Sequence, residues 1–249
     1  MLRKRVITVL TFNDGVLFRT KLFRPDYRYT LNFVDSWSVD EVVVLDITRP
    51  GDGDGANFEE VIRNFASRCF VPLSAGGGIR TLDDVRRFMA LGADKVVVNT
   101  GALERPELIR EIAEAYGVQC VVLSIDAKRH DDGRYEVFGS YGSQATGRSP
   151  EDWAREGEDL GAGEILITSI DRDGWLQGYD IELCKKVSEA VSIPVLALGG
   201  CGSWKHMDEV FSEADVSAAC TQNIYHFTEP SIRAAKKYLD ARNIAVRLS

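Results

Sequence analysis

The sequence is poor in features that mark metal enzymes, membrane proteins and nucleic-acid-binding proteins. It has three histidines, and His130, His206 and His226 share no helical or strand spacing, which argues against a metal site. It lacks the run of roughly 18 apolar residues that a membrane span needs, and its start lacks the apolar segment of a signal peptide. Its net charge of −8 argues against a nucleic-acid partner. We therefore expect neither a metal nor a cofactor, and neither a nucleic-acid nor a membrane partner.

The cysteines are too irregular for a disulfide framework. They number five, stand in apolar segments, and show no C-x-x-C spacing. Such a set is typical of reduced core thiols. We therefore expect a cytoplasmic protein with free thiols at positions 69, 120, 184, 201 and 220.

Short apolar runs alternate with helical patterns along the chain. Eight such units in 249 residues fit one closed barrel, which takes about 250 residues, better than a doubly wound sheet or two ordinary domains. We predict an α/β fold, a single (β/α)8 TIM barrel domain over residues 1–249. The expected strands are 6–10, 42–47, 73–75, 95–98, 120–125, 165–169, 194–198 and 216–220. The expected helices are 30–38, 57–67, 81–91, one opening near Pro106, 150–160, 180–190, 203–213 and 230–241.

The two halves of the chain resemble each other, which predicts a half-barrel internal repeat. The segment 72–100 matches 194–223, and Val122–Asp126 matches the strand that ends at Thr11. Two long connections follow the matching strands. We expect a polar loop up to Tyr29 in the first half, and a loop over 128–147 in the second, where residues 134–138 could form a hairpin arm.

Glycines follow two of the expected strands and precede a helix each time. Gly76, Gly77 and Gly78 end the first stretch, and Gly199 and Gly200 end the second. A strand that enters a helix through glycines presents backbone N–H groups to a phosphate. Each stretch could be only a tight turn, but two at repeat-related positions favour phosphate binding.

Carboxylates stand where the active site of such a barrel lies, at the carboxyl ends of the strands. Asp46, Asp126 and Asp173 are acid/base candidates there. The alternative is that aspartates after strands cap helices or turns. The loop after Asp126 does not start a helix, which favours a functional role for this residue.

Four charged residues stand at the opposite ends of the strands. Arg5, Glu41, Lys95 and Glu164 each come directly before an apolar run. They could be solvated strand entrances. Because buried charges must be paired, four charges of alternating sign could instead form a compensated ring across the barrel floor.

The motifs together resemble the HisF family, the cyclase subunit of imidazole glycerol phosphate synthase. The resemblance covers almost the whole chain and is carried by 73–80, 93–100, 125–129, 161–166, 168–174 and 178–180. It implies a (β/α)8 barrel with a HisH-type glutaminase docked beneath it as a heterodimer. It also implies that ammonia passes through the barrel to a doubly phosphorylated ribulosyl substrate. The resemblance further implies an ammonia gate made of the floor charges Arg5, Glu41, Lys95 and Glu164. It implies phosphate binding by Gly77, Gly78, Asn99, Thr100, Gly174, Gly199 and Gly200.

The chain departs from this family at catalytic positions. The resemblance implies catalytic aspartates at 126 and 11, and position 11 is Thr11. Threonine cannot replace a carboxylate base, whose loss typically costs about 10²–10⁴ in rate. Arg19 stands where the family's mobile first loop carries a lysine, and the bulky pair Thr221 and Gln222 replaces a small pair near the second phosphate.

These departures resemble the divergent HisF-like proteins of surface-polysaccharide (lipopolysaccharide) clusters. The resemblance implies that such a barrel supplies ammonia to a sugar amidotransferase that installs an acetamidino group on a nucleotide sugar. Two alternatives stay open: a genuine cyclase of histidine biosynthesis in which Asp126 works with Asp173 or Asp14, and a catalytically silent scaffold that binds a phosphorylated small molecule.

Overall fold

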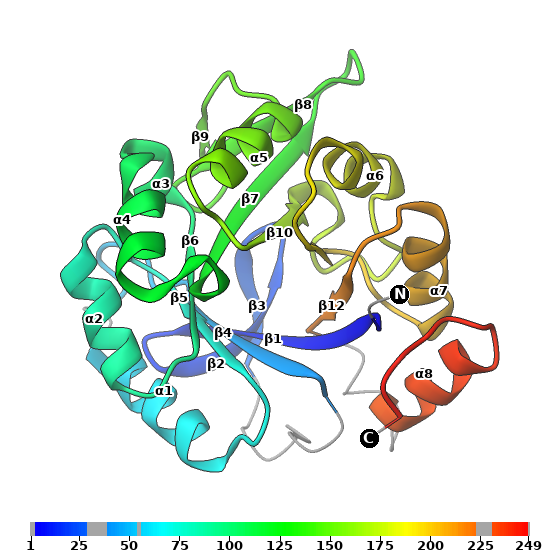
Figure 1. Cartoon of the computed structure of the whole chain (residues 1–249), viewed down its shortest axis with the longest axis horizontal. Helices are drawn as coiled ribbons and strands as arrows, with labels where there is room; N and C mark the ends of the chain where they lie inside the picture. Colours follow the sequence, from blue (N-terminus) through cyan, green and yellow to red (C-terminus); the bar gives the residue numbers. More distant parts are fainter. Residues whose placement is uncertain (1–2, 29–38, 54–55, 223–230, 249) are drawn as a thin grey trace.

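The computed structural model describes residues 3–28, 39–53, 56–222 and 231–248 (Figure 1). The expected helix over 30–38 lies outside the described residues.

Parallel strands close into a barrel, as predicted. Within the described residues, neighbouring strands pair in parallel around the whole ring, and the pairing of β10 with β7 closes it. The runs are rich in valine, isoleucine and leucine because both faces of each strand are buried. The barrel strands are β1 (Arg5–Asn13), β4 (Glu41–Asp46), β5 (Leu73–Gly76), β6 (Lys95–Val98), β7 (Val121–Arg129), β10 (Glu164–Ser169), β11 (Val195–Leu198) and β12 (Ala218–Thr221).

Helices surround the strands on the outside of the barrel (Figure 1). Their starts follow local capping rules: Thr81 and Asp84 form a capping box, and Ser149 caps a helix that opens with Pro150. The helices are α1 (Ala56–Arg68), α2 (Leu82–Ala90), α3 (Thr100–Glu104), α4 (Glu107–Tyr116), α5 (Pro150–Asp159), α6 (Ile181–Ala190), α7 (Trp204–Glu213) and α8 (Ser231–Asp240), with short 3-10 turns η2 (Val118–Cys120) and η3 (Ile170–Arg172).

Two antiparallel hairpin arms extend from the carboxyl ends of the strands. The arm β8 (Tyr135–Gly139), which pairs with β7 and with β9 (Gln144–Ala145), confirms the expected hairpin arm. The prediction of a loop before Tyr29 was wrong, because β2 (Val16–Lys21) and β3 (Arg24–Arg28) form a second arm on β1. Asp14 and Gly15 both have positive φ, which suits the two-residue hairpin turn that joins β1 to β2. Each half of the barrel thus opens with a nine-residue strand followed by an antiparallel arm.

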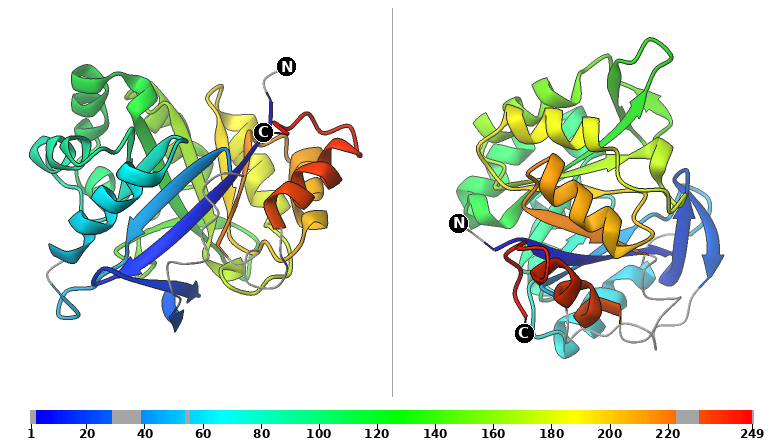
Figure 2. Two further views of the ribbon diagram at one scale, coloured as in Figure 1. Left: turned by 90° about the horizontal axis from the view of Figure 1, so that it is seen from below. Right: turned by 90° about the vertical axis from the view of Figure 1, so that its right-hand side faces the viewer.

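The arm β2–β3 marks the upper end of the barrel. Both views in Figure 2 place this arm at the end of the barrel opposite the two chain termini. We call the end that carries the arms the upper end, and the end at which the parallel strands begin the floor. None of the helices that the structure describes combines the length and apolar character that crossing a membrane requires. All five cysteines are free thiols, and Cys184, Cys201 and Cys220 are buried.

A buried ion pair fastens α8 to the floor. Lys236 Nζ lies 2.6 Å from Asp40 Oδ1, with side chains only 4% and 7% exposed. The other carboxylate oxygen of Asp40 accepts a hydrogen bond of 2.8 Å from the backbone N–H of Val6, so the pair also holds the start of β1.

Replacing Lys236 with alanine should therefore destabilise the protein strongly. Removing one partner of a buried pair leaves an uncompensated charge, which costs about 3–5 kcal/mol. Urea unfolding should show this loss, whereas Lys185→Ala, which removes a half-exposed lysine 3.9 Å from Glu189, should change the free energy of unfolding little. Equal effects of the two variants would contradict the structural role of the buried pair.

Candidate active site

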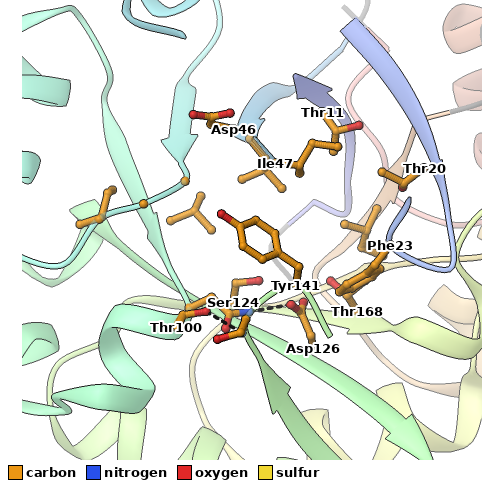
Figure 3. Close-up of a pocket in the computed structure, with 18 of the residues that line it drawn as sticks. Thr11, Thr20, Phe23, Asp46, Ile47, Thr100, Ser124, Asp126, Tyr141 and Thr168 are labelled. Atoms are coloured by element: carbon orange, nitrogen blue, oxygen red, sulfur yellow. Dashed lines mark hydrogen bonds between the residues drawn. The ribbon is translucent and has the colours of Figure 1, made fainter. Parts of the chain in front are cut away.

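A cavity of about 190 Å³ opens at the carboxyl ends of the parallel strands. This is where the active sites of (β/α)8 barrels lie. Nine of the residues singled out from the sequence line it: Thr11, Asp46, Gly77, Gly78, Asn99, Thr100, Asp126, Asp173 and Gln222. Figure 3 shows Thr11 and Asp46 on one side of the cavity, and Ser124 and Asp126 on the other.

Asp126 stands near the end of β7 and faces the cavity. Asn99 Nδ2 donates a hydrogen bond of 2.7 Å to Asp126 Oδ2. Burial raises the pKa of Asp126 to about 7, with nearby Asp173 adding to the rise, while hydrogen bonds from Asn99 and Thr168 oppose it. A carboxyl group that titrates near neutrality can accept or donate a proton, as a general acid/base must.

Asp173 lies directly after η3 and is tied to the arm β2–β3. Its carboxylate accepts hydrogen bonds from Thr20 Oγ1 at 2.9 Å and from the backbone N–H of Phe23 at 3.0 Å. Burial raises the pKa of Asp173, and these two hydrogen bonds oppose the rise. Asp173 therefore holds the arm as well as lining the cavity.

Thr11 offers no proton base to the cavity. Its hydroxyl donates a hydrogen bond of 2.6 Å to the backbone carbonyl of Phe18, across the β1–β2 pairing. Asp46 lines the same cavity, and its carboxylate accepts hydrogen bonds from the backbone N–H and the hydroxyl of Thr48. Burial raises the pKa of Asp46. The cavity thus has a carboxyl group at the end of β7 and a hydroxyl group at the matching place on β1.

The first glycine loop borders the cavity directly. Gly77 has φ of +123°, and a Cβ there would lie 2.5 Å from the Cβ of Asp46, so only glycine fits. Gly78 has φ of +66° and open space where a Cβ would point. Asn99 and Thr100, which follow β6, line the same cavity as this loop.

The second glycine loop lies away from the cavity. Gly199 and Gly200 of this loop are not among the described residues that line the cavity, and neither is Gly174, which follows η3. A Cβ on Gly200 would lie 2.1 Å from the carbonyl oxygen of Gly178, so backbone already occupies that side. Arg19 also stays outside the lining and forms an ion pair with Asp26 inside its own arm.

Sequence reasoning missed the residues that cover the cavity. Phe23 and Tyr141, at the tips of the two arms, both line it and both have positive φ, a strained conformation for bulky side chains. The hydroxyl of Tyr141 donates a hydrogen bond of 2.7 Å to the carbonyl of Thr48, and Arg49 donates one of 3.0 Å to the carbonyl of Phe23. The internal repeat could have predicted the arm β2–β3, because a hairpin arm was expected after the matching strand in the second half of the chain.

The four floor charges form a closed ring of ion pairs. Arg5 contacts Glu41 at 2.9 Å and Glu164 at 2.8 Å, and Lys95 contacts the same two carboxylates at 3.0 Å and 2.7 Å. The hydroxyl of Ser74 donates a further hydrogen bond of 2.8 Å to Glu41. The structure therefore favours the ring over four separate solvated entrances.

An apolar layer lies between the ring and the cavity. Along β6 and the residue after it, the inward side chains are Lys95, Val97 and Asn99. Along β10 they are Glu164, Leu166 and Thr168. The interior therefore changes from charged to apolar to polar along the barrel axis. The buried members of the layer are Ile7, Val9, Val43, Val97, Val122, Leu166, Leu196, Leu198, Ala218 and Cys220.

Comparison with known proteins places this arrangement in a family. A sequence model of the family described as "Histidine biosynthesis protein" matches residues 8–230. The chain is 42% identical over 254 residues to the imidazole glycerol phosphate synthase subunit HisF of Clostridium botulinum (strain Langeland), with 100% of each chain covered. The chain belongs to the HisF family.

A second family member confirms that the relation extends over the full chain. The imidazole glycerol phosphate synthase subunit HisF of Methanopyrus kandleri is 42% identical over 269 residues, covering 99% of this chain and 98% of that protein. The chain is therefore a cyclase-type subunit by family. Within the described residues, no cluster of histidine, cysteine, aspartate and glutamate side chains could hold a metal ion.

Proposed function

We propose that this chain is the ammonia-conducting barrel of a glutamine-dependent amidotransferase system. It receives ammonia from a HisH-type glutaminase at the floor and delivers it at the upper end. The acceptor is a nucleotide sugar that gains an acetamidino group during surface-polysaccharide synthesis. The observation that carries the proposal is the closed ion-pair ring beneath an apolar interior, combined with Thr11 at a catalytic position.

The interior suits neutral ammonia rather than ammonium. Moving a charge into an apolar layer without a partner costs far more than moving a small neutral molecule. The entrance at the floor is formed by the ring of Arg5, Glu41, Lys95 and Glu164. The apolar layer above the ring keeps ammonia away from water, which would protonate it.

The floor also offers apolar contacts to a partner. Phe70 and Val118 stand in connections that lead into β5 and β7, on the same side as the ring, with 78% and 53% of their surface exposed. Large exposed apolar side chains are typical of protein interfaces. The relatives are named as subunits, which supports a heterodimer with a glutaminase.

The cavity supports the proposal that the nitrogen is used outside this barrel. A cyclase of this family uses a second carboxylate where this chain has Thr11, whose hydroxyl is engaged by Phe18. Asp126 alone can move one proton but has no carboxylate opposite it on β1. We therefore propose that the nitrogen leaves the barrel unreacted and is used in a neighbouring sugar amidotransferase.

A genuine cyclase is the second candidate. The relatives named HisF are similar over the full length, and both Asp126 and Asp173 line the cavity. In this case Asp173, or Asp14 on the β1–β2 turn, would take over the task of the missing carboxylate.

Turnover of the histidine-pathway intermediate with ammonium salt, without any partner, separates the two candidates. The proposed function predicts no cyclisation, together with activation of glutamine hydrolysis when a HisH-type glutaminase from the same organism is added. Robust cyclisation would establish the cyclase instead. Failure of both reactions would leave only a phosphate-binding scaffold.

Phe70→Asp should weaken the complex with that glutaminase by about tenfold or more, because a charge would replace the proposed apolar contact. Isothermal titration calorimetry measures this dissociation constant. The matched control is Leu22→Asp, a 45% exposed apolar residue at the upper end, which should leave the affinity unchanged. Equal affinities for the Phe70 variant and the parent protein would show that the glutaminase docks elsewhere.

A further inference from the structure

We propose that the upper end of the barrel is a docking surface for the enzyme that consumes the ammonia, a protein whose contact face is apolar at its centre and acidic around it. We call the side chains of Leu22, Tyr141 and Trp175 the upper patch. The inference rests on the proposed function, to which it adds the residues that bind the second partner.

The tip of the arm β2–β3 is a tight turn built from residues that such a turn disfavours. Leu22 and Phe23 form the two-residue turn between β2 and β3, with φ of +50° and +61°. Positive φ at both positions suits asparagine and glycine, whereas bulky apolar side chains strain the backbone there. Phe23 lines the cavity, whereas Leu22 lies outside the lining and has 45% of its surface exposed. Leu22 therefore presents an apolar side chain to solvent from a conformation that favours a polar residue.

The tip of the other arm has the same character. Tyr141 is 38% exposed and has φ of +60°, between Ser140 at +49° and Gly142 at +75°. A Cβ on Gly142 would lie 3.1 Å from Cδ2 of Phe23, so the two tips lie against each other (Figure 3). Arg49 joins them, because it donates a hydrogen bond of 3.0 Å to the carbonyl of Phe23 and its guanidinium carbon lies 5.5 Å from the centre of the Tyr141 ring. Backbone strain of this kind is retained mainly at functional sites.

Trp175 continues the upper patch beside the first tip. It is 43% exposed, and Lys21 Nζ lies 4.1 Å from the centre of its ring. The backbone N–H of Leu22 donates a hydrogen bond of 3.3 Å to the carbonyl of Asp173, two residues before Trp175. Three of the six large apolar side chains that are exposed in the described part of the chain thus gather around the cavity mouth. Aromatic side chains grouped in this way are typical of protein interfaces.

The charge of the arm β2–β3 indicates the chemistry of the partner. Its strands and turn carry the basic residues Arg19, Lys21, Arg24 and Arg28 and one acidic residue, Asp26, whereas the whole chain has a net charge of −8. A symmetric dimer through the upper patch would bring two basic arms to one interface, which disfavours a second copy of this chain. A different protein with acidic residues around an apolar centre complements both the arm and the patch.

The position of the upper patch indicates which protein docks there. The cavity lies beneath both tips, and Phe23 and Tyr141 belong to its lining. A protein seated on the patch covers the mouth, so ammonia that arrives there meets the partner before it meets bulk water. The proposed glutaminase contacts lie at the floor, opposite the arm β2–β3, so both partners can bind at once.

Calorimetric titration of the purified sugar amidotransferase from the same organism into the complex of this chain with its glutaminase tests the inference. The parent complex should bind, and Trp175→Ala and Leu22→Asn should each weaken binding by about tenfold or more. Because asparagine tolerates a positive φ, Leu22→Asn should leave the urea midpoint of unfolding unchanged or raise it, whereas a structural role for Leu22 would lower it. The matched control is Leu248→Asn, at a 50% exposed leucine near the carboxyl terminus at the opposite end of the barrel, which should leave the affinity unchanged.

A charge reversal tests the acidic character of the partner. Arg24→Glu, at an exposed position of the arm, should weaken binding severalfold, and high salt should weaken the parent complex more than this variant. Equal or tighter binding by the variant would show that the partner's contact face is not acidic.

The outcomes separate the docking surface from the proposed function. Unchanged affinity in the Leu22 and Trp175 variants would overturn the surface, as would a parent complex that binds no amidotransferase. In both cases ammonia transfer in the reconstituted system would leave the proposed function intact. Normal docking without ammonia transfer would remove the function and keep the surface. A dimer of the parent chain that Leu22→Asn dissociates would assign the upper patch to a second copy and overturn the proposal.

Discussion

Lys95→Ala is expected to let ammonia escape from the complex with the glutaminase. Glutamine hydrolysis should continue, but most of the ammonia should appear in solution instead of in the aminated product. The physical reason is the geometry of the ring, in which Lys95 bridges Glu41 at 3.0 Å and Glu164 at 2.7 Å. Without it, a gap bordered by carboxylates admits water to the floor of the barrel.

The measurement compares glutamate formed with free ammonia released, in a reconstituted system that contains the glutaminase and the ammonia-consuming enzyme from the same organism. Lys95→Arg keeps the charge and should keep most of the transfer. Because Lys95→Ala leaves buried carboxylates with fewer partners, the variant loses stability. Lys95→Met/Glu164→Gln removes equal and opposite charges, leaves the pair of Arg5 and Glu41, and tests the gate in a better compensated background. Unchanged transfer in both variants would refute the gate.

Asp126→Asn is expected to stabilise the protein above neutral pH. The pKa of Asp126 is raised to about 7 from 3.8, chiefly by burial, so ionisation of this group opposes folding. Between these two pH values the folded protein holds a proton that the unfolded chain has lost, and stability falls as pH rises through that window. Above pH 7 the penalty is complete, at about 4 kcal/mol, and asparagine removes it.

Urea unfolding of both proteins across this pH range measures the difference. The gain in the free energy of unfolding should be about 4 kcal/mol near pH 8 and less than half of that near pH 5. Asn99 can still donate its hydrogen bond to the new amide oxygen, so the variant keeps its packing. Asp131→Asn, at an exposed position, should show no such dependence. A gain that does not change with pH would mean that Asp126 titrates normally in the folded protein.

Local patterns were sufficient for most of the barrel. Strands such as Val195–Leu198 are continuous apolar runs, and the capping box at Thr81 marks the start of the helix Leu82–Ala90. The arm β2–β3 was missed because its residues mix aromatic and charged side chains without the clean alternation of a half-buried strand. Only its pairing with β1 makes it a strand.

Some residues of the candidate site could likewise be predicted from the sequence, and others could not. Asp126, Asn99 and the first glycine loop were predicted to lie at the carboxyl ends of strands, and the structure brings them together around one cavity. Phe23 and Tyr141 could not be found by that rule, because they reach the cavity from the tips of the arms. Their position depends on how far each arm extends and where it folds back.

The sequence by itself determined the barrel, the ends of the strands at which chemistry can occur, and the absence of a carboxylate at position 11. The barrel and the strand ends follow from the short-range periodicity of apolar residues. The missing carboxylate follows from the identity of residue 11 alone. Tertiary structure decided that the four floor charges close into one ring, and that of two glycine loops with the same local pattern only the first borders the cavity. The physical reason is that both outcomes depend on contacts between segments far apart in the chain, such as Thr20 with Asp173, which local sequence does not encode.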